Sequence, residues 1–290
     1  MPSDKRQRQK ERERAAREAQ AAAEHRAKQR RTWIQLGGLV VLIVVLAALY
    51  SIFAGGDDDD GDGADTATDT SAETSDEDAA TDPDAEPLPC PPAEGVDEPV
   101  LDFPAPPPDC LEEGASYEAV FDTTAGEIRV ALDVEETPNT ANNFAYLARY
   151  GYYDGTDLFR SNTGIEILQG GSPHTNSSSD PGPGYNLEDE GDFRVDEVTG
   201  ELSGPYTYEP GQLVMARTPL PDGAGAQFFF TTGPAASQLD GTGTYVVFGN
   251  VTEGMDVLEA IMATHEDGDQ PGEGAPNPVP VVNSVQIVQT

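Results

Sequence analysis

A run of 22 uncharged and mostly apolar residues, 33–54, constrains this chain more than any other feature. At about 1.5 Å of rise per residue, a helix of this length spans the ~30 Å hydrocarbon layer of a membrane. A cleaved signal peptide is the alternative, but its apolar core is usually only ~7–15 residues long. The run therefore predicts a single uncleaved transmembrane helix, with the rest of the chain divided between the two sides of a membrane.

Charge is distributed unevenly around this run. Residues 1–32 hold eleven of the sixteen Lys and Arg residues and five acids, which leaves 16 − 11 = 5 arginines and 53 − 5 = 48 acids for the remainder. Basic flanks stay on the cytoplasmic side, so we expect a single-pass cell-membrane protein with a cytoplasmic N-terminus and an extracytoplasmic C-terminal part. The basic segment is interpreted as a topology signal near anionic headgroups, in preference to a nucleic-acid-binding or lipid-binding arm. No nucleic-acid partner is expected.

Residues 55–115 are rich in acidic residues and proline, and the pattern predicts a linker. Its first half has almost nothing to bury and repels itself, so we expect it to be extended and disordered. The spacing of Asp58, Asp60 and Asp62 matches the start of a calcium loop, but no amphipathic helix follows. No metal site is therefore expected.

Cys90 and Cys110 are the only cysteines, and both lie in the proline-rich end of this linker. Outside the cell, two free thiols would be unusual. A disulfide is therefore favoured over a metal-binding pair or free thiols, and it would fasten the end of the linker near the folded domain.

The folded domain is predicted to occupy residues 116–290. YEAVFDTT and EIRVALD alternate apolar and polar residues around Ala125 and Gly126, which indicates a β-hairpin. Thr137 is the expected cap of a helix with Pro138 at its first position. Short strands separated by glycine-rich turns follow, then a second helix at 255–262 and a last strand near 281–288. This pattern predicts a mainly β domain, a closed antiparallel barrel capped by two helices.

Eight segments then carry a resemblance to a known family. They are TPNTANNFAYLARYGYYDG, LFR, LQGG, EDE, EPGQLVMA, AQFFFTT, LDGTGTYVVFGNV and GMDVLEAI. In this order, over residues 117–290, the chain resembles the cyclophilins, which are peptidyl-prolyl cis-trans isomerases. The resemblance implies an eight-stranded barrel, two capping helices and a groove for proline-containing segments. The predicted anchor, linker and paired cysteines further resemble exported cyclophilins of actinobacteria.

The chemistry of such a site can be stated from first principles. Rotation about an X-Pro bond must break amide resonance, at a barrier of ~18–20 kcal/mol. No covalent bond is made, so no nucleophile, metal or cofactor is expected. The site must bind the twisted amide better than either planar form, through an apolar pocket and a fixed donor aimed at the prolyl nitrogen. Arg160 can be that donor, because a guanidinium is always charged and offers several N–H groups in a rigid fork.

The resemblance assigns a role to particular residues of this chain. Arg160 in LFR matches the catalytic arginine, and Gln169 in LQGG matches the glutamine that binds the substrate backbone. The substrate-binding positions it implies are Ile167, Gln169, Ala216, Gln227, Phe229, Leu239 and Tyr245. Phe229 and Leu239 would be apolar walls, although such residues are usually plain core. The alternative for Arg160 is a surface ion pair.

Other positions depart from the family pattern. Phe159, Gln238 and Arg217 replace a histidine, a tryptophan and an asparagine, and Tyr245 replaces a late histidine. Gln238 implies weak cyclosporin binding.

Glu166 is the most consequential departure, because it falls on or beside a pocket phenylalanine. Strand alternation places Ile165, Ile167 and Gln169 on one face and Glu166 on the other, so we expect Glu166 at the rim. In the alternative, Glu166 pairs with Arg217 or Arg160 and occludes the groove.

Two functions remain open at this stage. The first is a membrane-anchored isomerase that assists the folding of exported or cell-envelope proteins. The second is a cyclophilin-fold module that binds proline-containing peptides with little or no turnover.

Overall fold

The computed structural model describes residues 85–196 and 199–290. The basic segment, the predicted anchor and the first part of the predicted linker lie outside the described residues. In the described part of the chain, no helix combines the length and the apolar character that crossing a membrane requires.

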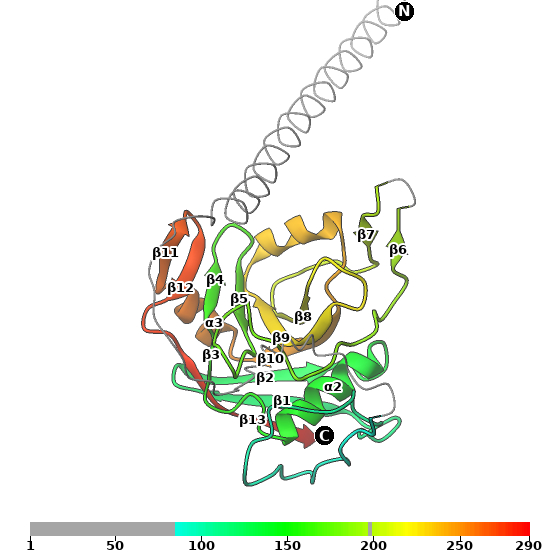
Figure 1. Ribbon diagram of the computed structural model, residues 1–290. Coiled ribbons are helices and arrows are strands. Elements are labelled where there is room, and N and C mark those ends of the chain that lie inside the picture. The colour runs from blue at the N-terminus through cyan, green and yellow to red at the C-terminus, as the bar shows by residue number, and fades with distance from the viewer. Residues whose placement is uncertain (1–84, 197–198) are drawn as a thin grey trace, which may run out of the picture. The chain divides into compact units, whose positions relative to one another are not determined.

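The described residues form thirteen strands, two α-helices and one 3-10 helix (Figure 1). The first half contains β1 (Tyr117–Thr123), β2 (Gly126–Leu132), α2 (Pro138–Arg149), β3 (Thr156–Asp157), β4 (Arg160–Asn162), β5 (Ile167–Gly170), β6 (Arg194–Val195) and β7 (Leu202–Ser203). The second half contains β8 (Gln212–Arg217), β9 (Ala224–Thr231), η1 (Pro234–Gly241), β10 (Val247–Glu253), α3 (Met255–Met262), β11 (His265–Gln270), β12 (Glu273–Pro276) and β13 (Val281–Gln289).

Eleven of the strands form one antiparallel sheet in the order β11-β12-β4-β5-β9-β8-β10-β2-β1-β13-β3, and β6 and β7 form a separate pair. β3 pairs with β13 and β4 pairs with β5. The ladder is therefore open between β3 and β4, although only Leu158 and Phe159 separate them in sequence.

The expected closed eight-stranded barrel is thus wrong in its closure and strand count. The strand that would close it is interrupted at Leu158 and Phe159, where Leu158 turns into the core with none of its surface exposed. An additional hairpin, β11–β12, extends the sheet beyond β4. The predicted hairpin at β1–β2 and both predicted helices are confirmed.

One face of the sheet forms the main core against α2. Leu168, Leu213, Met215, Phe228 and Phe230 alternate along β5, β8 and β9 and are all buried there. Phe121 of β1 contacts both Phe228 and Phe230, with ring centroids 5.5 and 5.3 Å apart. Alternation along a strand sends the intervening residues to the opposite face, which is where the candidate site lies.

Helix α2 begins at Pro138 as expected, but it is capped differently. The side chain of Thr137 makes no capping hydrogen bond and instead donates to the carbonyl of Asp133. The carboxylate of Glu190 accepts from the backbone N–H groups of Asn139 and Thr140, both at 2.8 Å. A carboxylate from a distant loop therefore satisfies the orphan donors of the first turn.

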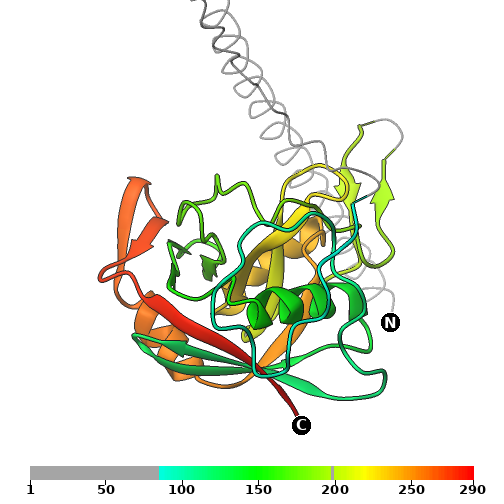
Figure 2. The ribbon, with the colours of Figure 1, turned by 60° about the horizontal axis from the view of Figure 1, so that its bottom comes forward.

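Residues 85–115, which we call the strap, pack against the domain rather than extending from it. Phe103 is 3% exposed and joins the main core, with its ring 5.4 Å from those of Tyr146 and Tyr150. Figure 2 shows the strap, in cyan, passing across α2. The strap is the C-terminal part of the linker predicted over residues 55–115, and it lies against the domain as expected for the end of that linker. Phe103 packs against Tyr146 of α2, and carbonyls of the strap accept hydrogen bonds from side chains of that helix.

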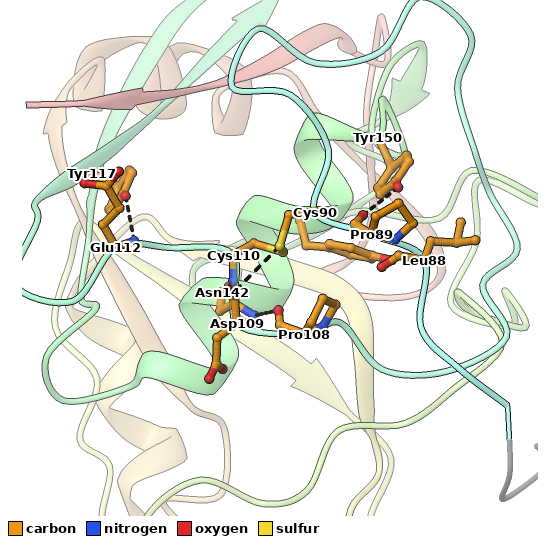
Figure 3. Close-up of a disulfide and its surroundings, with 11 residues drawn as sticks. Leu88, Pro89, Cys90, Pro108, Asp109, Cys110, Glu112, Tyr117, Asn142 and Tyr150 are labelled. Atoms are coloured by element: carbon orange, nitrogen blue, oxygen red, sulfur yellow. Dashed lines mark hydrogen bonds between the residues drawn. A yellow bond between two sulfur atoms is a disulfide. The ribbon is translucent and has the colours of Figure 1, made fainter.

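A disulfide joins Cys90 and Cys110 (Figure 3). It lies beside Asn142 of α2, which accepts a hydrogen bond from the Cys110 N–H and donates to the carbonyl of Pro108, at 2.8 and 2.9 Å. The hydroxyl of Tyr150 donates to the carbonyl of Pro89 at 2.8 Å. The disulfide thus closes the strap where it is already bonded to the helix.

Candidate functional site

A row of directly opposed residues crosses β4, β5, β9 and β8 on the face away from the main core. Arg160 is opposite Gln169, Gln169 is opposite Phe229, and Phe229 is opposite Val214. Directly opposed residues in antiparallel strands project to the same side. The sheet therefore places the predicted donor, the predicted amide-binding side chain and an aromatic ring side by side.

Arg160 is held at three of its nitrogen atoms. Its Nε and Nη2 donate to the two carboxylate oxygens of Glu273, at 3.0 and 2.8 Å, and its Nη1 donates to Oε1 of Gln169 at 2.7 Å. The Arg160 side chain is 31% exposed. A guanidinium has five N–H groups, so these three bonds leave two for a substrate.

Gln169 connects the arginine to the next strand. It is 7% exposed, and its Nε2 donates to Oε1 of Gln227 at 2.9 Å. Gln227 in turn donates to the carbonyl of Ser178 at 3.4 Å. The two predicted glutamines therefore form one polar chain that begins at the Arg160 guanidinium.

An apolar cluster lies on the same face, next to this polar chain. We call it the outer cluster; its buried members are Ile167, Tyr208, Val214, Phe229 and Ala236, and its half-buried members are Ile165, Ala216, Leu239, Tyr245, Val247 and Tyr206. It is separate from the main core, and its rim is accessible. All the apolar residues that the sequence assigned to the site therefore belong to one cluster.

Tyr245 and Tyr208 form one side of the outer cluster. The Tyr245 ring packs edge-on against Phe229, with ring centroids 5.5 Å apart. The hydroxyl of Tyr208 donates to the carbonyl of Tyr245 at 3.0 Å and accepts from its N–H at 2.8 Å. Burial raises the pKa of Tyr208, so its phenol stays neutral and keeps both bonds. Sequence reasoning missed Tyr208, because nothing in its local pattern marks it.

Ala216 lies where the outer cluster meets a cavity of about 240 Å³. The register between β8 and β9 shifts between Met215 and Arg217, so Ala216 sits at an irregularity of the ladder. Gln169 and Gln227 also line this cavity. Ala216, a predicted substrate-binding position, therefore lies beside the two glutamines at the edge of the outer cluster.

Glu166 turns away from both arginines. It lies in the turn before β5 with φ at 48°, and its carboxylate accepts from the backbone N–H of Ala235 at 2.6 Å, near the start of η1. The rim interpretation is confirmed, but not by alternation, since Glu166 precedes the strand. The carboxylate holds η1, the element that carries Leu239, against the sheet.

Arg217 pairs with an acid other than Glu166. Its Nη1 lies 2.6 Å from Oδ1 of Asp189, and its side chain is 3% exposed. Its guanidinium carbon is 5.2 Å from the centroid of the Phe193 ring. The alternative in which Arg217 or Arg160 pairs with Glu166 is therefore wrong.

Gln238 and Phe159, two further departures from the family pattern, lie outside the outer cluster. Gln238 is exposed and donates to the carbonyl of Gly164 at 2.7 Å, and Phe159 is half-buried. Neither side chain belongs to the outer cluster.

Glu273 was not found by sequence reasoning. It is one of many acids in an acidic domain, and 113 residues separate it from Arg160. Partial burial acts to raise its pKa, but its bonds with Arg160 and Asn162 outweigh burial and lower the pKa below its ordinary value. The group is thus ionised at neutral pH.

The arrangement can bind a peptide and stabilise a twisted amide. A fixed cation beside an apolar, partly accessible cluster can meet a prolyl nitrogen while the ring contacts apolar side chains. Among the described residues, no group of three or more His, Cys, Asp or Glu side chains is placed to hold a metal ion.

Comparisons with known proteins show which family the chain belongs to. The family model for cyclophilin type peptidyl-prolyl cis-trans isomerase/CLD matches residues 119–288. Peptidyl-prolyl cis-trans isomerase cyp18 of Streptomyces antibioticus is 33% identical over 174 residues, which is 58% of this chain and 96% of that protein. Peptidyl-prolyl cis-trans isomerase B of Bacillus subtilis is 35% identical over 130 residues, 45% of this chain and 79% of that protein.

A crystal structure of a cyclophilin type peptidyl-prolyl cis-trans isomerase from Cryptosporidium parvum aligns with a TM-score of 0.48 and 24% identity, covering 60% of this chain and 99% of that one. The match of the family model to more than half of the sequence, together with the curated relatives, establishes that the chain belongs to the cyclophilin-type peptidyl-prolyl cis-trans isomerase family.

Proposed function

We propose that this protein isomerises X-Pro bonds in exported or cell-envelope proteins, with Arg160 as the donor to the prolyl nitrogen. The observation that carries the proposal is the fixed guanidinium of Arg160, one strand away from Gln169 and two from Phe229 on the same face of the sheet. Its two remaining N–H groups are available for a substrate.

The proposed mechanism needs only binding groups. The proline ring contacts the outer cluster around Phe229 and Leu239, and the substrate backbone lies along Gln169 and Ala216. As the amide twists, the nitrogen lone pair localises and accepts a hydrogen bond from Arg160. This bond is made only in the twisted state, so it lowers the barrier rather than tightening ground-state binding.

The contacts of Glu166 and Arg217 favour turnover over mere peptide binding. Glu166 bonds to Ala235, and Arg217 pairs with Asp189. Neither draws Arg160 away from the outer cluster.

Residues 33–54 are proposed to anchor the protein, with the domain outside the cytoplasm. The Cys90–Cys110 disulfide supports this placement, because disulfides persist mainly in oxidising compartments. The clients are then proline-containing segments of proteins that fold on the same side of the membrane.

A protease-coupled isomerisation assay on a set of Xaa-Pro peptides tests the activity. We expect catalysis above the uncatalysed rate, and binding without acceleration would favour the peptide-binding module instead. Protease added to right-side-out vesicles tests the topology. It should remove the C-terminal domain and spare an N-terminal tag, and protection of the domain would exclude this topology.

A further inference from the structure

We propose that Glu273, at the start of β12, is a positioning residue that aims the Arg160 guanidinium at the substrate. This inference rests on the proposed function, in which Arg160 donates to the prolyl nitrogen. It assigns a role to the β11–β12 hairpin, which extends the sheet beside β4 (Figure 1).

The geometry of the pair favours orientation over simple charge neutralisation. The two oxygens of Glu273 engage Nε and Nη2 of Arg160, at 3.0 and 2.8 Å. A two-point contact fixes the plane of the guanidinium, which a single contact cannot do. Gln169 then fixes rotation of the side chain by binding Nη1 at 2.7 Å.

Glu273 is itself held in place by β4 and the turn after it. The side-chain amide of Asn162 donates to Oε1 of Glu273, and the two residues are directly paired across β12 and β4. The backbone N–H of Thr163 donates to the carbonyl of Gly272 at 2.9 Å. The carboxylate that orients Arg160 is therefore attached to the same strand as the arginine.

Strand β11 of the hairpin is also hydrogen-bonded to β4 and to the turn before Glu273. His265 of β11 lies with its Nδ1 2.7 Å from Oγ of Ser161, and its Nε2 lies 3.0 Å from Oδ1 of Asp267. Asp267 also accepts from the backbone N–H of Gly272 at 2.7 Å. These bonds connect β11 to the turn that precedes Glu273.

Gly274 shows how closely the two strands approach. A Cβ at this position would lie 1.9 Å from the backbone carbonyl oxygen of Glu266, so the hairpin requires glycine there. Close approach of the strands and the bonds through Asp267 give the hairpin a defined geometry. Glu273 is thus presented to Arg160 from a fixed element rather than from a loop.

The alternative is an ordinary surface ion pair. The Arg160 and Glu273 side chains are 31% and 38% exposed, and exposed pairs usually contribute little to stability. The two interpretations differ in what a mutation changes. A surface pair alters stability slightly and leaves catalysis alone, whereas a positioning residue changes turnover.

The first experiment compares Glu273→Gln with Glu266→Gln, each made in the full chain with its disulfide intact. Glu266 is an exposed acid in the same hairpin, so both variants lose one negative charge there. Isomerisation of an Ala-Pro peptide is followed by exchange NMR, which gives kcat and KM separately. We expect kcat of Glu273→Gln to fall roughly 10- to 100-fold, as when the partner that orients a functional group is lost, with KM little changed. Glu266→Gln should match the wild type.

The second experiment uses the Arg160→Ala background. There, Glu273→Gln should have no further effect on kcat, because it acts only through the arginine. An additive loss would overturn the proposal. If Arg160→Ala is inactive while Glu273→Gln behaves as Glu266→Gln does, the positioning role is refuted and the proposed function stands. If Arg160→Ala is fully active, both the proposed role of Arg160 and the positioning role of Glu273 are refuted.

A pH profile gives a readout that a structural role would not move. Because the pKa of Glu273 is lowered in the folded protein, the carboxylate stays ionised as the pH falls through the ordinary pKa of a glutamate. It becomes protonated only at a lower pH. The wild-type kcat should therefore fall in acid, and the kcat of Glu273→Gln should lack that step; identical profiles would contradict the proposal. Should Glu273→Gln fail to fold, Glu273→Asp keeps the charge and shortens the reach, and full activity in that variant would overturn the inference.

Discussion

At the scale of single residues, the carboxylate of Glu166 illustrates how one side chain keeps a site open. Its backbone adopts a positive φ of 48°, which few residues other than glycine and asparagine adopt. That conformation turns the side chain toward the N–H of Ala235 and away from Arg160. The carboxylate thereby holds η1 and leaves the outer cluster apolar.

We predict that Glu166→Gln has little effect, because an amide oxygen can still accept from Ala235. The domain should lose less than about 1 kcal/mol of unfolding free energy, and kcat/KM should be unchanged. Glu166→Phe, in contrast, removes the acceptor and should cost about 1–3 kcal/mol without any gain in activity. Urea unfolding and isomerisation assays measure both, and a marked gain in kcat/KM for Glu166→Phe would place the carboxylate in the pocket instead.

At the scale of elements, local patterns predicted where elements lie but not what completes them. Pro138 correctly marks the start of α2, yet the residue that caps the helix, Glu190, is about 50 residues away in sequence. The buried surface of α2 also includes the polar side chain of Asn142 and the ring of Tyr146. The strap covers that side of the helix, and no pattern within α2 could reveal it.

The same limit applies to the candidate site. The order of motifs identified Arg160, Gln169 and Phe229, because each lies in a short segment that resembles the family. Glu273 and Tyr208 carry no such signal. Strand pairing brings Glu273 to the site, whereas Tyr208 precedes β8 and reaches the outer cluster through its hydrogen bonds to the backbone of Tyr245. The interruption of the sheet at Leu158 depends on tertiary packing and could not be predicted either.

For α2 we predict that Glu190→Gln destabilises the domain by roughly 0.5–2 kcal/mol. Each oxygen of Glu190 accepts from one N–H group of the first turn, and an amide leaves one of these two N–H groups without its acceptor. A charged acceptor at a helix N-terminus is also favoured by the helix dipole. The exposed neighbour Glu188 provides the control, and Glu188→Gln should be within about 0.5 kcal/mol of the wild type. Equal effects of the two substitutions in urea unfolding would show that the cap contributes nothing.

At the scale of the whole molecule, the strap makes the domain larger than the family match. That match begins at residue 119, whereas the strap adds Phe103 to the core and is bonded to α2 at several points. The sequence suggested a linker because acidic residues and prolines dominate its composition. The strap is held by Phe103, by half-buried apolar side chains such as Val100 and Leu101, and by its hydrogen bonds to Asn142 and Tyr150.

Reduction of the disulfide should therefore destabilise the domain. A closed loop of about this size is worth roughly 3 kcal/mol in the chain-entropy view, and Cys90 and Cys110 are 20 residues apart. We expect the urea midpoint to fall on addition of reductant, and to fall similarly without reductant in a Cys90→Ala, Cys110→Ala double variant. A wild-type midpoint insensitive to reductant would mean that the disulfide does not stabilise the domain.

The central claim is that Arg160 stabilises the twisted amide, and the activity of Arg160→Ala tests it most directly. Arg129→Ala is the matched control, because Arg129 is ion-paired with Glu118 on the β1–β2 hairpin and takes no part in the candidate site. We expect kcat/KM of Arg160→Ala to fall about 100- to 1,000-fold, equivalent to about 2.7–4 kcal/mol of transition-state stabilisation, with Arg129→Ala near the wild type. An Arg160→Ala variant that folds normally and retains wild-type kcat/KM would contradict the account.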